Sequence, residues 1–108
     1  MAQVLKILGQ AAPLATTETD LYTVPAATTA AISSLVICNR GAATTIRVSV
    51  SAAGAVTATK DYIYYDVALP ANETLIATVG ITLAATDKVR VYAGTANTSF
   101  AVYGSENT

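Results

Sequence analysis

A continuous apolar run followed by an alternating segment limits what this chain can fold into. The run Leu35-Val36-Ile37-Cys38 contains no polar position, so both faces of that segment need cover. In residues 45–50 the apolar side chains fall on every second position, which is the period of a half-buried β-strand. The sequence therefore predicts a central strand followed by an amphipathic one. The short turn at residues 39–43 predicts that the two form one hairpin.

Short β-rich segments continue along the whole chain. They recur about every ten residues, are bounded by Gly, Pro, Asn or Asp, and leave no amphipathic stretch long enough for a helix. In residues 88–93 the apolar side chains again alternate with polar ones, and the last strand is expected to end at Tyr103. The predicted fold class is all-β: an antiparallel two-sheet sandwich, a jelly roll of about eight strands. With 108 residues the chain forms a single domain, residues 1–108.

The first twelve residues are a candidate contact segment. Gly9 and Pro13 separate them from the next strand, so residues 1–12 could form an extended N-terminal arm. Such an arm can pair with its own sheet, with a neighbouring subunit or with a larger shell. The candidate interface residues on this arm are Val4, Leu5, Ile7 and Leu8.

A Tyr-rich strand in the middle of the chain is the second candidate surface. Strict alternation places Ile63, Tyr65, Val67 and Leu69 on one face of this strand, and Tyr62, Tyr64 and Asp66 on the other. Tyrosine offers a large, stiff contact area with a polar tip, so Tyr62, Tyr64 and Tyr92 are candidate interface residues. Cross-strand packing within the sheet is the alternative explanation for the same residues.

The chain has little charge. Only 12% of its residues are charged, against about 25% in typical soluble domains, and this leaves sheet edges poorly defended against association. We therefore expect self-association, as a homo-oligomer. The net charge of −1 provides no basic field for a nucleic acid, and no apolar stretch approaches a membrane span or a secretory signal. We expect synthesis in the cytoplasm and neither nucleic acid nor membrane as a partner.

The residues give no pattern for catalysis. The chain has no His, which removes the commonest general base, the His-dependent nucleophile systems and most zinc sites. Asp61 and Asp66 should point to opposite faces of one strand, while Glu18 and Asp20 are too few for a calcium loop. A single Cys inside an apolar strand, Cys38, is most simply a small core residue. We expect no enzyme activity, no cofactor and no metal.

Several segments together resemble a known family. They are Leu8-Gly9-Gln10 with Pro13, Leu21-Tyr22-Thr23-Val24-Pro25, Leu35-Val36-Ile37-Cys38-Asn39-Arg40, Tyr64-Tyr65-Asp66, Leu83-Ala84-Ala85-Thr86-Asp87, Val91-Tyr92-Ala93, Phe100 and Gly104-Ser105-Glu106. The series resembles small β-rich virion structural proteins of tailed bacteriophages, including cyanophages. The resemblance implies a capsid decoration (cement) protein, usually a trimer, bound over the joints of the major capsid protein on the capsid surface. Synthesis would then occur in the cytoplasm of the host bacterium.

Two alternatives remain open beside this role. A tail, baseplate or fibre component of the virion would also be small, β-rich and oligomeric. A carbohydrate-binding β-sandwich module could use Tyr62, Tyr64 and Tyr92 as stacking platforms, although the chain has no Trp to strengthen such a site.

Overall fold

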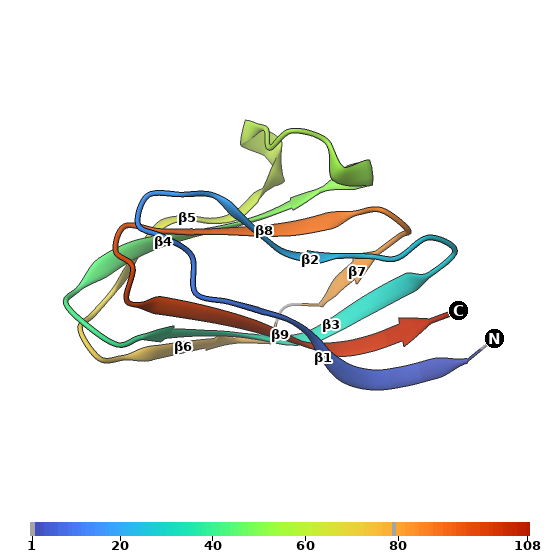
Figure 1. Cartoon of the computed structure of the whole chain (residues 1–108), viewed down its shortest axis with the longest axis horizontal. Coiled ribbons are helices and arrows are strands. Elements are labelled where there is room, and N and C mark those ends of the chain that lie inside the picture. Colours follow the sequence, from blue (N-terminus) through green and yellow to red (C-terminus); the bar gives the residue numbers. More distant parts are fainter. Residues whose placement is uncertain (1, 79) are drawn as a thin grey trace.

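The computed structural model describes residues 2–78 and 80–108, and most of them lie in strands. The strands are β1 (Gln3–Ala11), β2 (Thr19–Thr23), β3 (Thr29–Asn39), β4 (Thr44–Ser51), β5 (Tyr62–Leu69), β6 (Thr74–Ala77), β7 (Ile81–Leu83), β8 (Lys88–Ala93) and β9 (Thr98–Asn107). Two short 3-10 turns, η1 (Ala52–Gly54) and η2 (Thr59–Asp61), lie on the loop between β4 and β5. The strands form two antiparallel sheets that face each other (Figure 1). The predicted all-β two-sheet sandwich is confirmed.

The strand order is that of a jelly roll. Sheet A has the order β1-β9-β3-β6, with β7 also paired to β3, and sheet B has the order β2-β8-β4-β5. Because β6 and β7 pair with successive parts of β3, together they occupy the place of one interrupted edge strand. Counted in this way, every connection except that between β4 and β5 crosses from one sheet to the other, as in an eight-stranded jelly roll.

The facing sides of the two sheets form the core. Ile46 and Val48 on β4 and Val89 on β8 are all 0% exposed, so the alternation predicted for both segments is confirmed. Leu35 and Ile37 are equally buried on β3, which lies between β9 and β6 as the predicted central strand. Burial of each such side chain contributes about 1.5–3 kcal/mol to the driving force for folding.

The hairpin predicted between β3 and β4 was wrong. β3 belongs to sheet A and β4 to sheet B, so the turn between them is an arch that joins the two layers. Asn39 is buried at its base and its side-chain amide donates to the carbonyls of Ala42 (2.9 Å), Leu69 (3.3 Å) and Pro70 (3.0 Å). Its Oδ1 accepts a hydrogen bond from the Gly41 N–H (3.0 Å). The Asn39 side chain thus satisfies backbone groups of the turn and of the end of β5.

The Tyr-rich strand β5 also departs from the predicted alternation. Tyr64 packs against the core, whereas Tyr65 is 56% exposed, so the faces assigned to these two residues were wrong. Two β-bulges are the cause: Tyr65 and Asp66 together oppose Arg47, and the pairing register then skips Ile63, which is also exposed. Asp66 has a φ of 50°, a left-handed conformation that Asp tolerates better than most residues.

The N-terminal segment is an integral strand of sheet A. β1 pairs with β9 along its length, so the described part of the predicted arm (residues 1–12) is not a free extension. β9 continues to Asn107, past the strand end predicted at Tyr103. Ala2 and Thr108 exchange two backbone hydrogen bonds, 3.0 and 2.9 Å long, and the two chain ends lie side by side (Figure 1).

Candidate functional site

The outer face of sheet A carries no charged side chain among the described residues. We call this surface the neutral face. Strand pairing aligns its outward side chains in rows that run across the sheet, and the row at one end is Gln3-Asn107-Thr29. Four further rows carry the apolar side chains. From β1 toward β6 and β7, the rows are Leu5-Ser105-Ala31-Thr82, Ile7-Tyr103-Ser34, Gln10-Ala101-Val36-Ile76 and Ser99-Cys38-Thr74.

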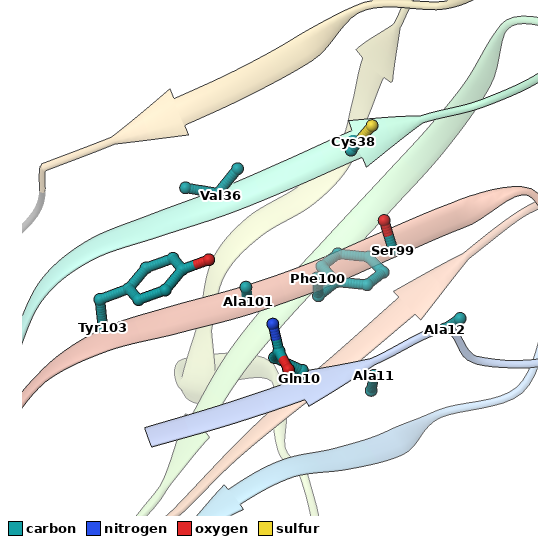
Figure 2. Close-up of a pocket in the computed structure, with 9 residues that line it drawn as sticks. All are labelled: Gln10, Ala11, Ala12, Val36, Cys38, Ser99, Phe100, Ala101 and Tyr103. Carbon is teal, nitrogen blue, oxygen red and sulfur yellow. The ribbon is translucent and has the colours of Figure 1, made fainter. Parts of the chain in front are cut away.

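Projecting apolar side chains and shallow hollows shape the neutral face. Leu5 is 80% exposed, Ile7 53% and Ile76 65%. A hollow of about 480 Å³ lies beside Tyr103 on the side of Val36, and Figure 2 shows the side chains around it. A second hollow of about 340 Å³ is also lined by Tyr103, next to Leu5. The neutral face therefore has projecting apolar side chains with shallow hollows between them.

The neutral face is comparable in size to the largest apolar patch of an ordinary monomer. Four strands about 4.8 Å apart, carrying four rows about 6.8 Å apart, cover a flat area of roughly 500 Å². The largest apolar patch of an ordinary monomer measures about 300–600 Å² and is often functional. The area of the neutral face lies in this range, and all of its polar side chains are uncharged.

Both edges of sheet A are protected against strand addition, so the expectation of poorly defended edges was wrong for this sheet. β1 carries Lys6 and a bulge between Ile7 and Gly9. The opposite edge consists of two very short strands, β6 and β7. Charges, bulges and short strands are the usual means of preventing edge-to-edge pairing.

The outer face of sheet B is charged. Arg47 forms an ion pair with Asp66 (2.6 Å), and Asp20 accepts from both Lys88 (2.7 Å) and Arg90 (3.0 Å). The hydrogen bond from Arg47 holds the pKa of Asp66 below its usual value, and the hydrogen bond from Lys88 is the main cause of the lowered pKa of Asp20. Both carboxyl groups are therefore ionised at neutral pH, and the two outer faces differ sharply in charge.

An aromatic cluster lies on this charged face. The guanidinium carbon of Arg47 is 4.3 Å from the ring centre of Tyr65 and 4.4 Å from that of Tyr92, so it is held between two rings. Tyr62 meets Tyr65 edge to face, with ring centres 4.8 Å apart. Beside these two rings is a hollow of about 560 Å³, whose other wall is residues 57–59 of the β4–β5 loop.

The β4–β5 loop is fixed by Arg90. Its guanidinium donates to the carbonyls of Gly54 (3.1 Å) and Ala55 (2.6 Å) and to the hydroxyl of Thr57 (3.1 Å). This loop lies over the outer side of sheet B (Figure 1). The hollow beside the tyrosines is thus shaped by a loop that β8 holds in place.

The structure separates the four candidate residues of the N-terminal segment. Leu5 and Ile7 lie on the neutral face. Val4 is 52% exposed and faces the other side of β1, together with its partner Glu106 on β9. Leu8 is only 9% exposed and belongs to the core, so it is not accessible to a partner.

The three candidate tyrosines are also separated. Tyr62 lines the hollow on sheet B and Tyr92 stacks on Arg47, whereas Tyr64 packs into the core and offers no outer platform. Tyr65 was not identified from the sequence, because the bulges in β5 are not visible in its pattern. Tyr103 was not identified either, although the continuous apolar run on β3 indicated that the sheet it lies on needed cover on both faces.

A buried carboxyl group and its tyrosine partner have a structural role. Glu106 is 9% exposed, accepts a hydrogen bond from the Tyr22 hydroxyl and forms an ion pair with Lys6 (2.9 Å). The hydrogen bond from Tyr22 is the main cause of the lowered pKa of Glu106, and burial is the main cause of the raised pKa of Tyr22. These contacts join β1 and β9 of sheet A to β2 of sheet B.

The described residues contain no group of three or more His, Cys, Asp or Glu side chains placed to hold a metal ion. Over the same part of the chain, no helix is long and apolar enough to cross a membrane. Comparison with protein-family models, with curated proteins and with solved structures finds no match. The residues and the fold of this chain are therefore the basis on which a function can be proposed.

Proposed function

We propose that this chain is a structural protein of a virus particle, a decoration (cement) protein of a bacteriophage capsid. It associates with further copies of itself and binds the shell of the major capsid protein, which it stabilises from the outer surface. The proposal assigns it no catalytic activity and no cofactor.

The observation that carries the proposal is the eight-stranded jelly-roll order. This architecture recurs in viral capsid domains, in lectins and in cupins. The likeness of several segments to phage virion proteins favours the capsid among these classes.

The neutral face adds a second argument. A decoration protein has to be held in place by large complementary surfaces, and it needs no activated side chain. The neutral face offers such a surface, while the titratable side chains described above are engaged in ion pairs and hydrogen bonds that tie strands and a loop together.

The location of the protein on particles tests this proposal. Particles of the virus that encodes the chain would be purified and examined by mass spectrometry and image reconstruction. We expect hundreds of copies over the head. A few copies at one vertex would instead support a tail, baseplate or fibre component, and absence from purified particles would contradict any virion role.

The hollow on sheet B supports a second candidate function, the binding of a neutral sugar. Tyr62, Tyr65 and the hydroxyls of Thr57 and Thr59 line it, a combination of aromatic surface and hydrogen-bonding groups that suits a sugar ring. Glycan-array binding that is lost in Tyr65→Ala but kept in Tyr103→Ala would support this function. An array without hits would remove it.

A further inference from the structure

We infer that the neutral face is a self-association surface, on which a second copy of this chain packs sheet against sheet about a two-fold axis. This inference deepens the self-association in the proposed function and rests on that proposal for its biological setting. The contact itself can be measured with the isolated protein.

The central strand β3 provides the first argument. Leu35 and Ile37 on its inner side are 0% exposed, so sheet B covers this side fully. Val36 and Cys38 on its outer side are apolar as well, but among the described residues no element packs over them. A central strand that is apolar on both sides is typical of a sheet covered on both faces. The second cover is missing in the single chain.

The distribution of charge over the two outer sheet faces favours a second copy of this chain as the partner that covers the neutral face. A two-fold contact places the same patch on both sides of the interface. Any net charge on the patch would therefore lie opposite an equal charge of the same sign. The neutral face has no charged side chain among the described residues, whereas the outer face of sheet B has five, including Arg47 and Asp66. The neutral face is therefore the one sheet face on which two copies can meet without like-charge repulsion.

The shape and the area of the neutral face fit a second copy of this chain. Leu5, Ile7 and Ile76 project from the neutral face, and hollows lie on both sides of Tyr103, so a second copy supplies both the knobs and the holes. Two such faces bury roughly 1,000 Å² in total, the lower bound expected of a specific interface. Two twisted sheets can pack about 10 Å apart at about −30°, as the sheets of a sandwich do.

The protected edges determine the geometry of the contact. Lys6, the bulge in β1 and the shortness of β6 and β7 oppose pairing through the edges of sheet A. Contact through the neutral face remains possible, and each neutral face can be covered by the neutral face of one other copy. The expected product is a dimer, which differs from the trimer that the resemblance to decoration proteins implies.

Sedimentation equilibrium of the full chain and of two pairs of variants tests this inference. Leu5→Asp places a charge on the neutral face, and Leu14→Asp changes an equally large side chain that is 73% exposed on a loop. Ile76→Asp and its control Val56→Asp, at a position 89% exposed, repeat the test at the other side of the sheet. Circular dichroism and thermal unfolding verify that each variant is folded.

We expect the wild-type chain and both loop variants to form a dimer. We expect both neutral-face variants to dissociate at least about tenfold more readily, because each would bury an unpaired charge. A monomeric wild-type chain, a trimer, or a dimer unaffected by both face variants would overturn the inference. A dimer formed by a protein that is absent from virus particles would contradict the proposed function and leave the self-association surface supported.

Discussion

Gly104 provides a sharp test of how closely the strands beneath the neutral face approach each other. It lies on β9, between β1 and β3, and pairs with Ile32. A Cβ at this position would lie 2.0 Å from the carbonyl oxygen of Ala31 and 3.0 Å from its carbonyl carbon. Both are backbone atoms and cannot rotate away. Gly104→Ala must therefore displace β9 from β3.

The cost of this displacement can be bounded. Overpacking of a well-packed site costs about 1–3 kcal/mol, and a clash with backbone places this variant near the upper end. A domain of this size has a free energy of unfolding of about 5–15 kcal/mol. A loss of about 3 kcal/mol lowers the melting temperature by roughly 10–20 °C.

Urea unfolding followed by circular dichroism measures this loss. Gly80→Ala is the matched control, because apart from its chain neighbours no described heavy atom lies within 4 Å of a Cβ at that position. We expect the control to change the free energy of unfolding by less than about 1 kcal/mol. All samples need the same protein concentration, since association adds to stability. If Gly104→Ala unfolds at the same urea concentration as the control, the close approach of β9 and β3 is wrong.

Three further substitutions test other parts of the structure. The contribution of Glu106 to stability should be present above its unfolded pKa of about 4.3 and be lost as the pH falls through its lowered folded pKa, so Glu106→Gln should be less sensitive to acid than the wild type in pH-dependent unfolding. An equal acid dependence of both proteins would contradict this. Asn39→Ala should lower the free energy of unfolding by about 1–3 kcal/mol in urea, because three carbonyls lose a donor, and an unchanged midpoint would argue against the arch. Arg90→Met should speed amide hydrogen exchange in residues 52–61, and unchanged exchange there would show that Arg90 does not fix the loop.

Local pattern was sufficient to predict most strands of this fold. The alternation in β4 and β8 is a property of each segment alone, and so is the apolar run of β3. The sheet that each strand joins is not a local property. The turn at residues 39–43 was predicted, but its role as an arch depends on contacts of Asn39 with Leu69 and Pro70, thirty residues further along the chain.

The candidate site was predictable only in part. Leu5 and Ile7 were identified as contact residues, because Gly9 and Pro13 set their apolar segment apart as a possible arm. Tyr103 and Ile76 were not identified, since a sequence alone does not show that β1, β9, β3 and β6 are neighbours. The bulges in β5 cannot be seen in the sequence, so strict alternation assigned Tyr64 to the wrong face.

Cys38 allows the cover of the neutral face to be measured without any substitution. It is the only cysteine in the chain, and it lies half-buried on the neutral face, beside the hollow shown in Figure 2, so its interpretation as a core residue was wrong. The rate of its alkylation by excess reagent therefore reports the fraction of chains whose neutral face is free. Raising the total concentration from one tenth of the dissociation constant to ten times that value lowers the monomer fraction from about 85% to about 20% by mass action. We predict that alkylation of Cys38 slows roughly fourfold over this range in the wild-type chain and at most about twofold in Leu5→Asp, whose dissociation constant is expected to be at least about tenfold higher. A rate independent of concentration in the wild-type chain would contradict a self-associating neutral face.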